Sequence, residues 1–197
     1  MKLYDLERSG NGYKVRLMLA LLELSYDQVR VDLSTGAHKQ PDYLALNPFG
    51  EIPLFCDGEL VLRDSQAIVT YLARAYGGET WLPSNPADMA RVLQWVSTAA
   101  NDIARGPADA RRHDLLGYAL DITKARAQTV RVIGIIEKHL ADRDWLELGR
   151  PTIADVCCFP YIALSYQGGV PLDNYPNVRA WIARIKALPG FVPMAGI

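Results

Sequence analysis

Hydrophobic positions recur at two different spacings along the chain, and the change of spacing separates a first half from a second half. Short runs with strand character occur at residues 2–6, 28–31, 54–56 and 60–62. Asp57-Gly58, between the last two runs, is typical of a tight hairpin. Apolar residues at helical spacing from Val15 to Leu24 predict a helix between the first two strands. This strand–helix–strand order predicts a parallel pair with a right-handed crossover.

Hydrophobic spacing and turn-forming residues also predict the elements in the rest of the chain. Residues 34–40 are polar and predict a loop, a short helix is expected near 41–46, and a helix from Ser65 to about Tyr76 closes the first half. Residues 77–86 are rich in glycine and proline, which is typical of a linker. Beyond them, helical spacing recurs at 87–103, 116–140, 153–166 and 178–188, without a convincing strand. The predicted organisation is a small α/β domain (1–76), a linker (77–86) and an all-helical domain (87–197).

Composition narrows the classes of partner. The 197 residues are half hydrophobic, and 21 basic against 22 acidic residues give a formal net charge of -1. This balance gives no excess of basic residues that would indicate binding to nucleic acid or to an anionic membrane. No apolar run reaches membrane-spanning length. The first ten residues lack the apolar core of a signal peptide. The three cysteines, Cys56, Cys157 and Cys158, form no C-x-x-C pair, so the simplest expectation is a reducing, cytoplasmic location.

The segment 47–72 carries the strongest local signals for ligand binding. Pro53 has no N–H to give to a sheet, so it is expected at a strand start or edge, where the backbone of Ile52 stays free to pair with a ligand. Asp64 and Ser65 come at the start of a predicted helix, whose unpaired N–H groups and dipole attract a carboxylate. The two features together indicate a site for a peptide-like ligand with a carboxylate. Asp and Ser are also favoured as ordinary helix caps, and the two roles are compatible.

Four motifs in the same order make the chain resemble the cytosolic glutathione transferases, nearly from end to end. They are Glu51-Ile52-Pro53, the segment LRDSQAI at 62–68, Thr152-Ile153-Ala154-Asp155, and the closing segment with Tyr175-Pro176-Asn177-Val178, Trp181 and Pro189-Gly190-Phe191. The resemblance implies an α/β thioredoxin-like N-terminal domain, an all-α C-terminal domain, and a cis peptide bond before Pro53. The residues alone favour trans, because only about 5% of X-Pro bonds in folded proteins are cis.

In that family the protein must stabilise the thiolate of glutathione. The reference pKa of such a thiol is about 8.5, and lowering it by about two pH units requires roughly 2.7 kcal/mol. Hydroxyl or amide donors at a helix N-terminus can supply this stabilisation. Serine-type bacterial and plant relatives place such a donor at the position of Ser9, and several bacterial ones use an asparagine at the position of Asn11. We therefore predict Ser9 as the leading sulfur donor, with Asn11 as partner or substitute.

Two alternatives stay open at the predicted sulfur position. Ser9 and Asn11 are residue types that often do no more than cap a helix. Other classes of the family use a tyrosine near the end of the first strand, which makes Tyr4 a rival. Tyr4 falls within the predicted strand, so packing is the simpler interpretation of it. Lys14 and Arg16, on the following helix, are expected at the surface or in ion pairs.

The resemblance also assigns residues to the rest of glutathione. The predicted glutathione-binding residues are His38, Lys39, Ile52, Pro53, Asp64 and Ser65. The two cations would face the glycyl carboxylate, although a solvated loop is an equal interpretation of them. Ile52 would pair main chain to main chain with the cysteinyl unit, and the Asp-Ser pair would hold the γ-glutamyl end.

The second-substrate pocket is expected between the Ser9 loop and the 87–103 helix. Its predicted wall residues are Tyr13, Thr98, Asn101, Asp102 and Arg105, although the face around Trp95 is equally consistent with core. Thr152 and Asp155 have the spacing of a capping box and are interpreted as structural. No cluster of side chains has the spacing of a metal site, so no metal is expected.

The leading hypothesis is a glutathione transferase, in which the thiolate attacks a hydrophobic electrophile. One alternative is a glutathione-dependent disulfide-bond reductase, because some bacterial members with a similar turn act in this way without a protein cysteine. Another is a non-catalytic glutathione-binding or regulatory protein, because one fold serves several functions. The resemblance implies a homodimer in which the first domain of each subunit packs against the helical domain of the other.

Overall fold

The computed structural model describes all residues from 1 to 197, and its strands all lie in the first third of the chain. They are β1 (Lys2–Asp5), β2 (Asp27–Arg30), β3 (Leu54–Asp57) and β4 (Leu60–Arg63). The strands form one mixed sheet in the order β2-β1-β3-β4. β1 and β2 are parallel, whereas β3 is antiparallel to both β1 and β4. The predicted parallel pair and the predicted hairpin are therefore confirmed.

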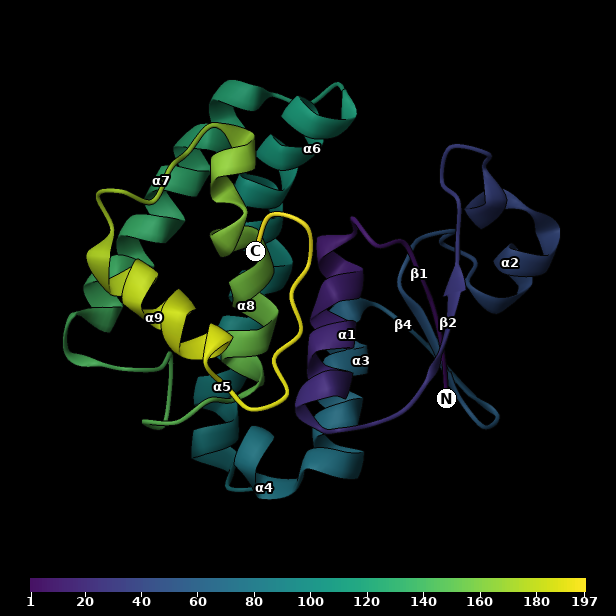
Figure 1. Cartoon of the computed structure of the whole chain (residues 1–197), viewed down its shortest axis with the longest axis horizontal. Helices are drawn as coiled ribbons and strands as arrows, with labels where there is room; N and C mark the ends of the chain where they lie inside the picture. The colour runs from purple at the N-terminus through teal and green to yellow at the C-terminus, as the bar shows by residue number, and fades with distance from the viewer.

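Helices cover both faces of this sheet. α1 (Gly10–Leu21) and α3 (Ser65–Leu72) lie on the face that is turned toward the second half of the chain, and α2 (Pro41–Leu46) lies beyond the other face (Figure 1). Leu3 and Phe55 of the sheet belong to the main core with α1 and α3. Tyr43 of α2 packs with Val31 and Leu54 in a small separate cluster. The first half is thus the expected thioredoxin-like layer of helices and sheet.

The second half is all helical, as the spacing of its apolar residues predicts. Its helices are α4 (Gly78–Trp81), α5 (Pro86–Thr98), α6 (Asp109–Leu116), α7 (Ile122–His139), α8 (Ile153–Ala163) and α9 (Pro176–Lys186). Wider π-helical turns, η3 (Ala99–Ala108), join α5 to α6 without a break. η3 contains Pro107, which has no N–H to donate, so one hydrogen bond of a regular α-helix is missing there. Short helical turns η1 (Ala37–Lys39), η2 (Ala73–Gly77), η4 (Leu140–Asp142) and η5 (Ser165–Gly168) complete the chain.

Two predicted helix boundaries in this half are wrong. The helix expected to end at residue 103 continues through η3 and α6 to Leu116. The helix expected at 116–140 starts only at Ile122, because Gly117 adopts a left-handed φ of 70° and ends α6. The side chain of Asp121 then accepts a hydrogen bond from the Lys124 N–H and begins α7.

α8 is the central helix of the second half and connects it to the first. It packs against α5, α1 and α3, and ten of its eleven residues are buried. The predicted capping box at its start is confirmed: Thr152 accepts from Ala154 N, and Asp155 accepts from Thr152 N at 2.9 Å. Asp155 also accepts from the ring N–H of Trp181 on α9, at 2.9 Å. This buried carboxylate therefore joins the start of α8 to the closing helix.

The last residues return to the first half. The segment after α9 runs along α1 (Figure 1), and the Tyr13 hydroxyl donates to the Val192 carbonyl at 2.7 Å. No helix of the chain is both long enough and apolar enough to span a bilayer.

Candidate functional site

Strand register brings three candidate segments to one end of the sheet. Tyr4 of β1 pairs with Leu54 of β3, and Leu54 pairs with Arg63 of β4. β1 and β4 therefore end where β3 begins. The turn after β1, the proline loop before β3 and the helix start after β4 consequently share one edge. The structure brings together the segments that carry Ser9, Ile52 and Asp64.

The Ser9 turn (residues 9–12) begins α1 with a side-chain cap. The Ser9 Oγ accepts a hydrogen bond from Gly12 N at 3.0 Å. A hydroxyl that accepts in this way still has its own proton to donate, so capping and sulfur binding are compatible at this position. A Cβ on Gly12 would lie 1.6 Å from Asp5 Oδ1, so no larger residue fits where the turn crosses β1.

Arg16 of α1 binds to the end of β1, next to the Ser9 turn. Its guanidinium forms an ion pair with the buried Asp5 and donates to the Glu7 carbonyl at 2.8 Å. The expected ion-pair role of Arg16 is therefore confirmed. Tyr4, the rival sulfur donor, lies in β1 and packs edge-to-face on Tyr43, with ring centroids 6.2 Å apart.

Lys14 is buried, so the prediction that it lies at the surface or in an ion pair is wrong. It is only 1% exposed and makes no ion pair. Its Nζ donates to Asn11 Oδ1 at 3.0 Å and lies 5.3 Å from the ring centroid of Tyr161 on α8. Burial lowers the pKa of Lys14, and the nearby Cys157, Cys158 and Asp64 oppose that change. The side chain turns inward because α8 packs over this part of α1.

Side chains of the helical domain close on the Ser9 turn, and the sequence analysis missed them. A Cβ on Gly10 would lie 2.6 Å from the Tyr161 ring, so the turn has glycine where that ring covers it. Arg111 of α6, 4% exposed, donates from Nη2 to the Arg8 carbonyl at 3.2 Å and from Nε to Gln167 Oε1 at 2.6 Å. Burial raises the pKa of Tyr161, while Arg112 and Arg111 oppose this. The position of the turn is thus set by both domains.

The loop before β3 has the expected backbone geometry. The Ile52-Pro53 peptide bond is cis, as the resemblance implies. The neighbouring Glu51 carbonyl accepts from Tyr43 Oη at 2.7 Å and from Asn47 Nδ2 at 2.8 Å. The N–H and carbonyl of Ile52 make no backbone hydrogen bond within the chain, because the ladder of β3 begins at Leu54. An extended ligand backbone can therefore pair with Ile52.

Asp64 and Ser65 form the start of α3. Asp64 has a positive φ of 72°, and its Oδ1 accepts from Gln66 N at 2.9 Å and Ala67 N at 3.0 Å. Ser65 is 2% exposed, and its hydroxyl lies 2.7 Å from Gln66 Oε1. The cap uses only one carboxylate oxygen of Asp64, which leaves the other available to a ligand ammonium.

His38 and Lys39 lie in η1, at the edge of the proline loop. Lys39 Nζ donates to the Phe49 carbonyl at 3.1 Å. His38 Nδ1 is buried without a hydrogen-bond partner, and burial, with a smaller effect of Lys39, lowers the pKa of His38. The Lys39 side chain therefore contacts the loop that carries Ile52, and the His38 carbonyl would lie 2.8 Å from a Cβ on Gly50 of that loop.

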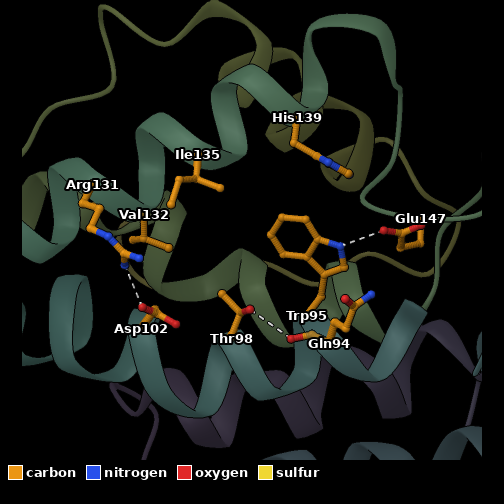
Figure 2. Close-up of a pocket in the computed structure, with 9 residues that line it drawn as sticks. All are labelled: Gln94, Trp95, Thr98, Asp102, Arg131, Val132, Ile135, His139 and Glu147. Carbon is orange, nitrogen blue, oxygen red and sulfur yellow. Dashed lines mark hydrogen bonds and ion pairs between the residues drawn. The ribbon is translucent and has the colours of Figure 1, made fainter. Parts of the chain in front are cut away.

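The predicted walls of the second-substrate pocket do not line a common cavity beside the Ser9 turn. Tyr13 is fully buried and hydrogen-bonded to the C-terminal segment, so it is a core residue. Thr98 and Asp102 line a pocket of about 330 Å³ between α5 and α7, in which Asp102 bonds to Arg131 at 2.9 Å (Figure 2). Asn101 and Arg105 line a neighbouring cavity of about 540 Å³, again with residues of α7. No residue of the first domain lines either one, because the η3 face that carries these side chains turns to α7.

These features define a class of protein: a thioredoxin-like domain with a cis-proline loop, joined to an all-helical domain that closes on the end of β1. No group of three or more His, Cys, Asp or Glu side chains is placed to hold a metal ion. The turn after β1 offers a hydroxyl and an amide, and it contains no thiol.

Comparison with known proteins identifies the family within this class. The family model for the glutathione S-transferase N-terminal domain matches residues 1–74, and the model for the C-terminal domain matches residues 119–189. Glutathione S-transferase 3 of Zea mays is 36% identical over 97% of this chain and 91% of its own length. The chain belongs to the glutathione S-transferase family, whose members use glutathione.

Two further relatives bear on structure and activity. The crystal structure of a glutathione S-transferase from Pseudomonas fluorescens superposes with a TM-score of 0.92, at 33% identity, over 98% of both chains. The disulfide-bond oxidoreductase YfcG of Escherichia coli is 30% identical over 91% of this chain and 87% of its own length. The relatives of the chain therefore include more than one activity.

Proposed function

We propose that the protein is a glutathione transferase that attacks a hydrophobic electrophile with the glutathione thiolate. Ser9 and Asn11 would donate hydrogen bonds to the sulfur, and the thiol proton would leave to solvent. The Ile52 backbone would pair with the cysteinyl unit. Asp64 and Ser65 would bind the γ-glutamyl end, and His38 with Lys39 the glycyl carboxylate. The reaction would form a carbon–sulfur bond and release the leaving group of the electrophile.

The observation that carries this proposal is the placement of the Ser9 turn. Strand register puts a hydroxyl and an amide at the same sheet edge as the unpaired Ile52 backbone and the Asp64 cap. A tripeptide that pairs with Ile52 and reaches Asp64 would bring its central side chain toward the end of β1. Ser9 and Asn11 would supply the donors that a thiolate needs there.

The experiment compares wild type with a Ser9→Ala, Asn11→Ala double variant, using reduced glutathione and chlorodinitrobenzene. We expect kcat/KM to fall at least about 100-fold, the loss that follows removal of one preorganised anion donor. Asn85→Ala is the matched control, because Asn85 caps α5 in the same way as Ser9 caps α1. Both variants lose a cap worth about 1 kcal/mol of stability, but only the double variant should lose turnover. Unchanged turnover in the double variant would overturn the assignment.

Glutathione-dependent disulfide reduction is a second candidate, and the similarity to YfcG favours it. The step would transfer the disulfide to two glutathione molecules, so the protein itself needs no cysteine at the turn. Turnover of hydroxyethyl disulfide and of chlorodinitrobenzene, measured on the same preparation, separates the two activities. Failure of immobilised glutathione to retain the protein would instead favour a non-catalytic role on this scaffold.

We also propose a homodimer in which the first domain of each subunit packs on the helical domain of the other. Phe49 on the proline loop is 55% exposed and stacks only on Arg63. The pocket between α5 and α7 offers Trp95 and Ile135 as apolar lining (Figure 2). Phe49→Ser should shift the protein toward monomer in light scattering, whereas Leu116→Ser, an exposed apolar residue on α6, should not. We place the protein in the cytoplasm, where its three free cysteines stay reduced.

A further inference from the structure

Lys14 is a buried lysine that no step of the proposed reaction uses. It lies on α1, one turn after Asn11, and only 1% of its surface is exposed. Lysine is almost never fully buried without a partner, because removing its ammonium from water is costly. Here the partners are neutral: the Asn11 amide oxygen at 3.0 Å and the face of the Tyr161 ring. When Lys14 is protonated, its positive charge therefore lies beside the Ser9 turn without an anion in contact with it, and burial lowers the pKa of this amine.

The contact with Lys14 fixes which way the Asn11 amide points. An ammonium has three donors and no acceptor, so it can bond only to the amide oxygen. The opposite orientation would place two donors against each other. The amide nitrogen of Asn11 is therefore turned away from Lys14, and it makes no hydrogen bond within the protein. This NH2 group is free to donate to a ligand.

The charged and titratable groups around Lys14 do not neutralise it. They come from α8, from the start of α3 and, behind Tyr161, from α6: Cys157, Cys158, Tyr161, Asp64, Asp109, Arg111 and Arg112. Burial raises the pKa of Cys157 to about 12, so this thiol is uncharged at neutral pH. Asp64 is the carboxylate in this set whose charge acts on Lys14, and it does not form an ion pair with Lys14. A ligand anion at the turn would supply the missing counter-charge.

We propose that Lys14 is a positioning residue of the glutathione site: it holds the Asn11 amide with its NH2 toward the sulfur and places a buried positive charge behind it. The inference rests on the proposed function and deepens it. The ammonium acts through Asn11 and does not touch the sulfur. In the protein interior, where electrostatic interactions are stronger than in water, such a charge favours the thiolate over the thiol.

The test is the pH titration of the bound thiol, followed by the ultraviolet difference absorbance of the thiolate. Lys14→Met removes the charge and keeps an apolar chain of similar length. We expect the apparent pKa of bound glutathione to rise by about one pH unit or more, with about tenfold less thiolate at neutral pH. Lys14→Gln keeps a donor for Asn11 without the charge, so we expect a smaller rise. Lys138→Met, which removes an exposed lysine on α7, should leave the titration unchanged.

S-methylglutathione separates positioning from a general loss of structure. It has no thiol to ionise, so its dissociation constant should change little in Lys14→Met. An unchanged thiol titration in either folded Lys14 variant would overturn the inference. So would weaker S-methylglutathione binding by the same factor as the loss of thiolate. If Lys14→Met does not fold, Lys14→Gln decides. The two proposals fail in different ways. If wild type itself binds glutathione without forming thiolate, the proposed transferase function fails. If wild type forms thiolate and the Lys14 variants titrate as wild type does, only the inference about Lys14 fails.

Discussion

At the Ile52 and Asp64 end of the proposed site the first domain acts alone, whereas the Ser9 end is completed by side chains from the helical domain. Ile52 and Asp64 are placed by backbone features, a cis peptide bond and a helix cap. The Ser9 turn is held by Tyr161 against Gly10 and by Arg111 on the Arg8 carbonyl. In the proposed site, binding of the glutathione backbone and activation of its sulfur would therefore depend on different parts of the molecule. Changes in the helical domain should affect the sulfur end more than the backbone end.

The largest expected effect tests whether α8 supports the sulfur end. Asp155→Ala would leave Trp181 Nε1, Leu146 N and Thr152 N without their buried acceptor. Each unsatisfied buried donor costs about 1–3 kcal/mol, so we expect at least about 3 kcal/mol less stability. Urea denaturation measures this change, with the exposed Asp142→Ala as the control. A loss of less than about 1 kcal/mol in the free energy of unfolding would contradict the role of Asp155 in linking the start of α8 to α9.

Gly10→Ala tests the two ends of the site separately, because it changes no side chain that is proposed to bind glutathione. The new Cβ would lie 2.6 Å from the Tyr161 ring, so the ring or the turn must move. Displacement of a reacting group by about 1 Å can cost about 100-fold in rate, and we expect kcat to fall by that order. S-methylglutathione binding should change little, because Ile52 and Asp64 are unaffected. Gly134→Ala, in open space on α7, is the matched control. Equal losses in kcat and in binding would contradict the separation.

Asp64→Asn is expected to have the smallest effect and to act at the opposite end. Asparagine still caps the helix, but it lacks the charge that would face the ligand ammonium. We expect the KM for glutathione to rise about tenfold, equivalent to about 1.4 kcal/mol, with kcat little changed. Asp121→Asn provides the control, since the Asp121 side chain also caps a helix, accepting from Lys124 N at the start of α7. A fall in kcat without a change in KM would indicate that Asp64 acts at the sulfur end, and would contradict its assignment to the γ-glutamyl end.

The features that could be predicted from the sequence are local ones. Asp57-Gly58 has the chemistry of a two-residue hairpin, and Thr152 with Asp155 has the spacing of a capping box; the structure contains both. The cis bond before Pro53 was implied only by the resemblance, because the residues alone favour trans. Each of these signals occupies a few consecutive residues, so it does not depend on how the domains pack.

The features that could not be predicted depend on long-range packing. Tyr161 and Arg111 reach the Ser9 turn from positions more than 100 residues later in the chain, and no spacing rule connects them. Lys14 is buried because α8 covers α1, whereas its residue type favours the surface. The predicted walls on η3 face α7 because η3 packs on that helix, a contact between segments far apart in the sequence. Local patterns therefore predicted the segments at the backbone end of the proposed site, but not the side chains of the helical domain that support its sulfur end.

A crystal structure with bound glutathione tests the central claim most directly. The account predicts the sulfur within hydrogen-bond distance of Ser9 Oγ or Asn11 Nδ2, the cysteinyl backbone paired with Ile52, and the γ-glutamyl group at Asp64 and Ser65. Glutathione bound at the same sheet edge with its sulfur turned to Tyr4, or bound away from the start of β3 altogether, would contradict it.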